Sequence, residues 1–477
     1  MRNPKLLSLI VIFLFATIHL SNAQNHARGL DFNDASYASA PKKARLTRAL
    51  DTMPASASIK KFAPYPKTQG QYGTCTAWAS AYCGRTLVDA IKYNWTNRDS
   101  ITANAYSPAF LFRLLRPDDQ VCTGGSNIET AFHLMKSTGS VHYSDIPLLC
   151  VPGINTDLLG KASNSLLKDY ARLFDVNSSA NIKVQAVKKS ISENKPVVFG
   201  MLCPPSFDYP TNKYWEPTEE ALDSYGGHAM CAVSYDDNLY GGAFEIQNSW
   251  GDTWGDKGYI WIKYADFARF VKYAYEFVDL PDPKPNTPDL SGSIKLALST
   301  GQDMPANLLI STRGLKVVPV NRTPEPLTIY QTANAYTSGT NFRIYISNNE
   351  PAYVYAISSD LSNQIVKIFP YEDGISAALT YKKNDVAIPD ESHYIQFDEK
   401  PGKDFLCVLY SRTELNINDI IGKIGTQDGS FNERVFKVLG DKLVDPANVK
   451  FAGGQIAFQA QGNGKDVIAL MVELDHR

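Results

Sequence analysis

A proline-rich segment at residues 280–288 constrains the fold of this chain more than any other feature, because it divides the sequence in two. Proline fixes φ and has no backbone N–H, so closely spaced prolines exclude a helix and favour an extended, semi-rigid spacer. The chain of 477 residues is also too long for a single hydrophobic core. We therefore predict a linker at residues 281–289 between a folded domain at residues 51–280 and a second domain at residues 290–477.

The N-terminus has the three parts of a signal peptide. Two basic residues precede an apolar run at residues 6–20, and the small residues at 21–23 suit a signal peptidase. We predict a signal peptide at residues 1–23 and export to the periplasm, the cell surface or the extracellular space; an uncleaved anchor is the alternative. Residues 24–50 are polar and alanine-rich, which favours a short leader or propeptide.

Charge, hydropathy and cysteine content limit the partners of the mature chain. The 47 basic and 49 acidic residues give a formal net charge of −2, so no basic field is present to gather nucleic acid. After the signal peptide, no stretch approaches the roughly 20 apolar residues of a transmembrane helix. The seven cysteines leave at least one free thiol in an exported protein.

In the first domain, helical patterns precede strand patterns, which predicts an α+β fold. Apolar residues recur at helical spacing from Cys75 to Lys92. Ser126 and Glu129 have the spacing of a capping box, which predicts a helix beginning at Ser126. Further helices are expected at residues 107–115 and 182–193, and strands at residues 196–201, 228–235, 243–247 and 259–264.

Three residues far apart in the sequence could form a nucleophile and its base. Cys75 begins a predicted helix, where unpaired amides favour a thiolate and lower the thiol pKa. His228 follows two glycines and opens an apolar strand, so its imidazole would be held rigidly and could act as base and then as acid. The amide oxygen of Asn248 could accept a hydrogen bond from the second ring nitrogen and fix the tautomer.

Three short motifs resemble those of the papain-like cysteine peptidases. Residues 69–78 read QGQYGTCTAW, where the family has Gln-Gly, two variable positions, and then Gly-Ser-Cys-Trp. Residues 122–125 read CTGG and resemble the family's Cys-Asn-Gly-Gly turn. Residues 248–251 read NSWG and match the family's asparagine motif. The resemblance covers residues 51–280 and implies a helical lobe and a β-barrel-like lobe with a cleft between them.

Position by position, the resemblance implies a catalytic set made of Gln69, Cys75, His228 and Asn248. Cys75 is then the nucleophile, His228 the acid and base, and Asn248 the residue that orients the imidazole. The side-chain amide of Gln69 and the backbone amide of Cys75 would form the oxyanion hole, where each donor is typically worth ~3 kcal/mol. The implied substrate-binding residues are Gly124, Gly125, Gly227 and Trp250. No cofactor or metal is implied, and the partners are protein or peptide substrates.

The sequence also departs from the family pattern. Tyr72 replaces the cysteine that usually bridges to the CTGG cysteine, so Cys122 either pairs with Cys150 or stays free. Residues 204–225 form an insertion before the histidine, which is either a specificity loop or surface packing. Gly227 brings no charge to the main specificity pocket, which indicates an apolar or unselective preference.

The second domain is expected to be β-rich, a sandwich with a helical insertion. Residues 342–346 and 352–357 have strand composition around a turn-prone Asn-Asn-Glu-Pro, which predicts a hairpin. Ser430 and Glu433 predict a capped helix that ends near Leu439. The domain resembles a β-domain of unknown function that is appended to bacterial exported and signalling proteins, and it could contact a surface or glycan.

The leading hypothesis is an exported cysteine peptidase that acts through a thioester on Cys75. The alternative is an inactive papain-like scaffold for binding or adhesion. A transglutaminase-like acyl transferase is a third possibility, but its usual aspartate is missing from the asparagine motif. Whether the peptidase is an endo- or exopeptidase depends on loops that the sequence does not reveal.

Overall fold

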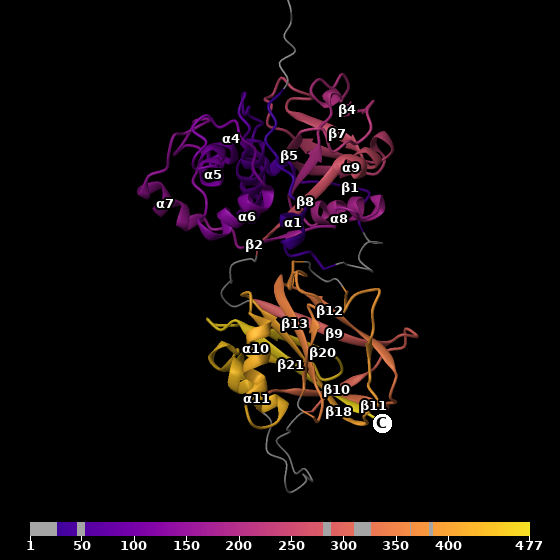
Figure 1. Cartoon of the computed structure of the whole chain (residues 1–477). Coiled ribbons are helices and arrows are strands. Elements are labelled where there is room, and N and C mark those ends of the chain that lie inside the picture. Colours follow the sequence, from indigo (N-terminus) through magenta and orange to yellow (C-terminus); the bar gives the residue numbers. More distant parts are fainter. Residues whose placement is uncertain (1–25, 45–52, 280–287, 310–325, 363, 381–384) are drawn as a thin grey trace, which may run out of the picture.

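The computed structural model describes residues 26–44, 53–279, 288–309, 326–362, 364–380 and 385–477. The predicted signal peptide at residues 1–23 and most of the predicted linker lie outside these residues. The described chain forms two bodies, one above the other in Figure 1. None of its helices is long and apolar enough to cross a membrane.

The upper body has a helical half, drawn on the left in Figure 1. A continuous helical segment begins at Cys75 and contains α2, a π-helical stretch η3, and α3. Asn127, not Ser126, caps α6, since its side chain accepts a hydrogen bond from the Thr130 amide; the predicted capping box is therefore wrong. The helices are α2 Cys75–Ala77, η3 Trp78–Arg85, α3 Thr86–Lys92, α4 Arg98–Ala103, α5 Pro108–Leu115, α6 Ile128–Ser137 and α7 Thr156–Ala162.

The other half of the upper body is a sheet with strand order β2-β8-β3-β5-β6-β7-β4, and β1 pairs with β5. Neighbouring strands are antiparallel except β4 and β7. The strands are β1 Ser56–Ser58, β2 Asp169–Arg172, β3 Val197–Leu202, β4 Tyr214–Trp215, β5 Gly227–Asp236, β6 Ala243–Gln247, β7 Tyr259–Lys263 and β8 Val271–Val278, with helices α8 Ala180–Ser192 and α9 Tyr264–Phe270. The helices-then-sheet order predicted from the sequence is confirmed.

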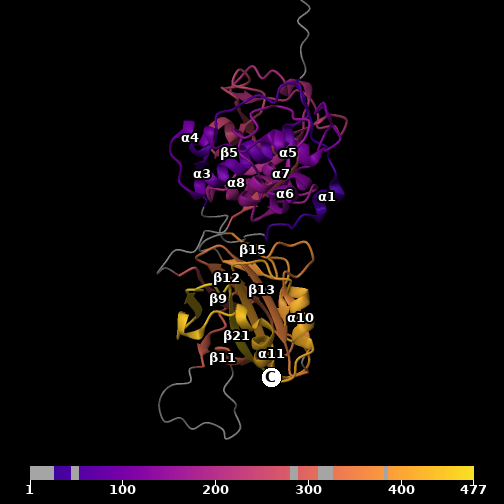
Figure 2. The same cartoon turned by 90° about the vertical axis from the view of Figure 1, so that its left-hand side faces the viewer.

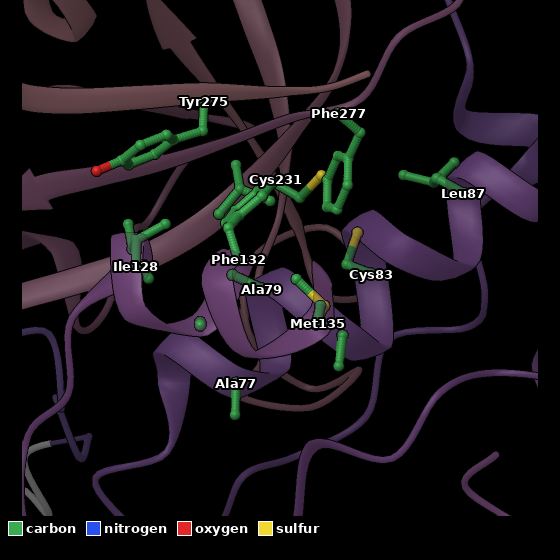
Figure 3. Packing of buried hydrophobic residues seen from close by; sticks show 14 of the residues in the cluster. Ala77, Ala79, Cys83, Leu87, Ile128, Phe132, Met135, Cys231, Tyr275 and Phe277 are labelled. Atoms are coloured by element: carbon green, nitrogen blue, oxygen red, sulfur yellow. The ribbon is translucent and has the colours of Figure 1, made fainter. Parts of the chain in front are cut away.

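A buried apolar cluster joins the two halves (Figure 3). Cys83 from the central helical segment points toward Phe277 of β8, and Cys231 of β5 lies beside the same ring. Gly84 is required at this contact because a Cβ atom there would lie 2.6 Å from the Phe277 ring. Close helix–sheet packing therefore fixes Cys75, the first residue of the helix, against strand β5.

The lower body is a sandwich of two sheets. The first has the order β10-β11-β21-β18-β13-β14, with β15 paired to β13; the second has the order β16-β12-β9-β20-β19, with β17 paired to β12. The strands are β9 Leu290–Leu298, β10 Ala306–Leu308, β11 Ile329–Tyr336, β12 Asn341–Asn348, β13 Ala352–Ser359, β14 Ile365–Phe369, β15 Ala378–Leu379, β16 Val386–Ile388, β17 Ile395–Gln396, β18 Gly402–Ser411, β19 Val449–Phe451, β20 Ile456–Ala460 and β21 Val467–His476. Helices α10 Ile417–Gly425 and α11 Phe431–Leu439 lie on one side (Figure 2). The capping box of Ser430 and Glu433 is confirmed.

The predicted hairpin of the lower body is wrong. Strand β12 pairs with β9, β16 and β17 in one sheet, whereas β13 pairs with β14, β15 and β18 in the other. The turn-prone link between them is a crossover, held by the Asn348 side chain, which donates to Glu350 O and Leu379 O at 2.8 and 3.0 Å. Strand β13 is buried almost throughout, and such a strand needs cover on both faces, which a simple hairpin does not supply.

The segment N-terminal to the upper body runs along it and ends between the two bodies. Residues 26–32 lie against both halves of the upper body, and α1 Asp34–Ser39 follows. Lys42 then forms parallel bridges with Arg172 of the upper body and with Ile375 of the lower body. We call residues 26–44 the leader, since they are the described part of the predicted leader at residues 24–50.

Candidate active site

His228 and Asn248 meet at the ends of two neighbouring strands. His228 is the second residue of β5, and Asn248 follows the last residue of β6, which is paired antiparallel to β5. The Nε2 atom of His228 lies 2.7 Å from Oδ1 of Asn248, and both residues are buried. Because an amide oxygen only accepts, Nε2 carries the proton and Nδ1 has the lone pair. Nδ1 has no hydrogen-bond partner among the described residues.

Trp250 covers this hydrogen bond. Its ring stacks on the His228 ring with centroids 4.4 Å apart and planes at 24°, and Trp250 is itself only 4% exposed. A hydrogen bond shielded from water is electrostatically stronger than an exposed one. The stacking therefore holds the imidazole in one orientation.

Cys75 is fully buried at the start of the central helical segment. Its thiol interacts with the backbone amide of Ala229, the residue after His228, and accepts a hydrogen bond from the Gly29 amide at 3.2 Å. Burial raises the pKa of the Cys75 thiol despite these donors. We expected a lowered pKa; the direction is opposite because burial of the thiol outweighs the donors around it.

Gln69 is fixed with its amide nitrogen toward the cleft. Its Oε1 accepts a hydrogen bond from Ser249 Oγ at 2.6 Å, and its Nε2 donates to Tyr72 O at 2.8 Å and to Ala27 O at 3.0 Å. The Ser249 hydroxyl thus sets which end of the amide faces a substrate. Ser249 was missed in the sequence analysis, although its place directly after Asn248 could have indicated it.

The leader fills the space between the two halves of the upper body. Leu30 N donates to Gly227 O at 3.2 Å on one side, and Asp31 N donates to Ser126 O at 3.0 Å on the other. Ser126 N donates in turn to Gly29 O at 2.9 Å. The leader is therefore paired as a strand to both walls of the catalytic cleft.

Of the predicted substrate-binding glycines, Gly227 and Gly125 lie against the leader in this cleft, whereas Gly124 does not. A Cβ atom on Gly227 would lie 2.4 Å from Leu30 O, and one on Gly125 would lie 2.0 Å from the Asp31 carboxylate. The backbone hydrogen bonds between this wall and the leader are made by Ser126, the neighbour of Gly125. Gly124 is turned away, and its amide donates to Asp119 Oδ2 at 2.7 Å.

The leader blocks the catalytic residues without presenting a bond for cleavage. Gln69 Nε2 binds the carbonyl oxygen of Ala27, whereas the Cys75 thiol contacts the amide of Gly29, two residues further on. Acyl transfer requires the nucleophile and the oxyanion donor to act on the same carbonyl group. Because they contact different peptide groups here, the bound leader presents no single carbonyl group to both.

His26 of the leader packs against the tryptophan that covers the catalytic hydrogen bond. Its ring stacks on Trp250 with centroids 4.4 Å apart. The predicted insertion contributes to the same surface, since Tyr209 lies 5.6 Å from the His26 ring. Trp215 of the insertion is buried in the core instead, so the insertion serves both as cleft wall and as packing.

Cys122 and Cys150 form a disulfide, which decides between the two alternatives left open by the sequence. Within the described residues the free cysteines are Cys75, Cys83, Cys203, Cys231 and Cys407. No group of three His, Cys, Asp or Glu side chains in the described chain could hold a metal ion.

Comparison with known proteins shows which protein families match the two parts of the chain. The model of the papain family cysteine proteases matches residues 64–272. These residues form a papain-family cysteine protease domain. A second model, for a domain of unknown function (DUF4384), matches residues 335–414. The resemblances drawn from the sequence motifs and from the C-terminal β-domain are thereby confirmed.

Relatives of this papain-family domain are distant. The chain is 26% identical over 244 residues to an uncharacterized peptidase C1-like protein of Acanthamoeba polyphaga mimivirus, covering 46% of this chain and 74% of the viral protein. It is 25% identical over 217 residues to cysteine proteinase 3 of Entamoeba histolytica, covering 44% and 63%. Among solved structures, xylellain, a cysteine protease from Xylella fastidiosa, has a TM-score of 0.42 at 18% identity, covering 53% and 95%.

Burial also sets the charge state of His228 in the leader-bound cleft. It lowers the pKa of the imidazole to about 3, and the nearby Arg28 and His26 charges act in the same direction. We expect His228 to stay neutral from pH 7 down to about pH 4 in the intact protein. Because the pKa lies below its ordinary 6.5, the unfolded state binds the proton first, and stability falls as the pH drops from about 6.5 towards 3.

This charge state can be measured by NMR titration of protein labelled with ¹⁵N at histidine. His228→Gln identifies the signal. An imidazole that titrates near pH 6.5 in the intact protein would contradict the burial of His228 beneath the leader.

Proposed function

We propose that this protein is an exported cysteine peptidase held inactive by its own leader. The observation that carries the proposal is the buried pairing of His228 with Asn248 beneath Trp250. The same cleft contains Cys75 at the start of a helix and the side-chain amide of Gln69, which already donates a hydrogen bond to a carbonyl oxygen. A nucleophile, a base, an orienting amide and an oxyanion donor are what acyl transfer requires.

In the proposed mechanism, His228 Nδ1 takes the Cys75 proton and the sulfur attacks the scissile carbonyl carbon. The oxyanion is stabilised by Gln69 Nε2 and the Cys75 amide. As the C–N bond breaks, His228 gives its proton to the leaving amine and a thioester remains. A water molecule then attacks the thioester while His228 accepts its proton, and the Cys75 thiol is regenerated.

Contacts of the leader suggest one substrate preference of this cleft. The Leu30 side chain is 5% exposed, and its Cδ2 lies 2.4 Å from the position that a Cβ on Gly200 would take. The Ile128 side chain is next to it. This recess suits an apolar substrate side chain, in line with the absence of charge at Gly227.

Two features support export. The signal-peptide pattern at residues 1–23 is the first, and the disulfide between Cys122 and Cys150 is the second, since disulfides persist in oxidising compartments. The C-terminal domain at residues 290–477 is then carried outside the cytoplasm with the peptidase, where contact with a surface or glycan is one use for it.

The test is intact mass after treating the purified protein with the epoxide E-64, with peptide mapping of the adduct. We expect one adduct on Cys75, formed slowly with the leader bound and fast once it is displaced. A folded protein with a reduced Cys75 that forms no adduct even after displacement of the leader would instead support an inactive binding scaffold.

A further inference from the structure

The leader places a basic side chain on a buried carboxylate beside the catalytic centre. Arg28 Nη2 lies 2.9 Å from Asp208 Oδ1, and the two side chains are 20% and 3% exposed. Arg28 lies between Ala27, which is bound to Gln69, and Gly29, which contacts the Cys75 thiol. The recess that receives the guanidinium group is therefore immediately next to the reacting atoms.

This recess is built by the sheet half of the domain. Asp208 follows η5 Pro205–Phe207, and its backbone oxygen accepts a hydrogen bond from Trp254 Nε1 at 3.0 Å, which fixes its position. The stem of Arg28 packs on Gly226, where a Cβ atom would lie 3.3 Å from Arg28 Cδ. The Cys203 thiol also interacts with the guanidinium group.

Departure of the leader would leave the Asp208 carboxylate without a counter-charge. The basic side chains that act on it, Arg28 and His26, both belong to the leader. Burial already raises the pKa of Asp208, and Arg28 partly offsets this. A buried carboxylate is unfavourable unless a cation or hydrogen-bond donors pair with it. The open cleft therefore has a site that a cationic group would stabilise.

Resting on the proposed peptidase function, we propose that Asp208 binds a lysine or arginine side chain of the substrate, in the first residue of the leaving group. The position of Asp208 assigns the basic residue to the leaving-group side of the scissile bond. Asp208 lies on the connection that leads from β3 to β5, the strand that carries His228, whose imidazole must reach the leaving amine. The Arg28 charge also acts on His228. The leader thus occupies this substrate site with its own arginine.

The test uses two quenched-fluorescence peptides that differ at one position, the first residue after the scissile bond. This residue is arginine in one peptide and its neutral isostere citrulline in the other. The enzyme is the full chain with the leader displaced by Gly29→Val. We expect kcat/KM to be about tenfold or more higher for arginine than for citrulline, and Asp208→Asn to abolish this ratio. Asp223→Asn, an exposed carboxylate of the same insertion that pairs with Lys272, should preserve the ratio.

An arginine-to-citrulline ratio near one in the parent, or a ratio that survives Asp208→Asn, would overturn this proposal. Cleavage of the citrulline peptide would still support the peptidase function in both cases. Failure to cleave either peptide, together with no E-64 adduct, would overturn the peptidase function as well. Thermal unfolding of Asp208→Asn checks that the isosteric change leaves the fold intact.

A separate set of contacts ties the end of the leader to the C-terminal domain. Lys42 N donates to Gly374 O at 2.5 Å, and Ser376 N donates to Lys42 O at 2.7 Å. The neighbouring Lys43 pairs with Glu276 of β8, a buried carboxylate that also accepts from Thr380 Oγ1 at 3.1 Å. Ala44 belongs to the apolar core of the lower body. Leader, peptidase and C-terminal domain therefore share one buried junction.

From this junction we infer that the C-terminal domain fastens the leader and so controls release of the cleft. This inference also rests on the proposed function of the leader. Fastening a segment at its end raises the effective concentration of the rest at its site. The Glu276 carboxylate keeps its charge in mild acid, because Lys43 and Lys195 lower its pKa to about 2 against the effect of burial.

The test compares Ala44→Asp with Ala38→Asp in the full chain. Ala44 is buried at the junction, whereas Ala38 is exposed on α1. A buried carboxylate without a partner should release the leader end, so we expect Ala44→Asp to speed E-64 labelling of Cys75 about tenfold. Ala38→Asp should leave the rate unchanged. Thr380→Val removes the hydrogen bond from the C-terminal domain to Glu276, and it should also speed E-64 labelling of Cys75.

Equal labelling rates in Ala44→Asp, Thr380→Val and the parent would overturn this inference, provided that Gly29→Val still accelerates labelling. That last condition separates failure of the junction from failure of the leader as an inhibitor. Circular dichroism and thermal unfolding establish that each variant remains folded.

Discussion

Cys75→Ala, made in the full chain with the leader displaced, should lower peptide hydrolysis at least about 10⁴-fold and abolish the E-64 adduct. The sulfur is the atom that forms the thioester, and alanine offers no nucleophile in its place. The measurement is kcat/KM on a quenched peptide, together with intact mass after E-64.

The matched control is Cys407→Ala. Cys407 is also a fully buried free thiol, but it lies on β18 of the lower body, away from the cleft. Its replacement should change neither activity nor labelling. Residual hydrolysis by Cys75→Ala near the parent rate would mean that another group is the nucleophile, or that a contaminant is being measured.

Gly29→Val should produce the largest gain of activity. A Cβ atom at Gly29 would lie 1.8 Å from Gly73 O, a backbone atom that cannot move aside without disturbing the loop before Cys75. The leader must therefore withdraw from the thiol. We expect E-64 labelling of Cys75 to rise roughly 10- to 100-fold, measured as a second-order rate by intact mass.

Gly153→Val is the control for this substitution, because no described atom beyond its two chain neighbours lies within 4 Å of the corresponding Cβ position. It should label at the parent rate. If Gly29→Val labelled no faster than Gly153→Val, the leader would not be what limits access to Cys75, and latency would need another cause.

Neither the contacts of the leader in the cleft nor the Asp208 recess could be predicted from the sequence. Residues 26–32 are too few to show a periodic pattern, and Arg28 and Asp208 are 180 residues apart in the chain. Their pairing exists only because the leader strand lies between Gly227 and Ser126. The direction of the Cys75 pKa shift also depends on tertiary packing, since burial of the thiol outweighs the helix start, which alone favours the thiolate.

In the C-terminal domain, local patterns located the strands and the capped helix but not the strand pairing. Residues 342–346 and 352–357 have strand composition and are joined by turn residues, and these signals are equally compatible with a hairpin and with a crossover between sheets. The structure has the crossover because β13 is buried on both faces.

The sequence by itself indicated the candidate catalytic set, because acyl transfer restricts which residue types can stand at Gln69, Cys75, His228 and Asn248. It also determined the order of helices and strands in the peptidase domain, because apolar periodicity follows local geometry. Only the tertiary structure decided that the cleft is closed by residues 26–32, and that Lys42–Ala44 connect the leader to the C-terminal domain. These features depend on long-range packing and on exclusion of water, which no local pattern encodes.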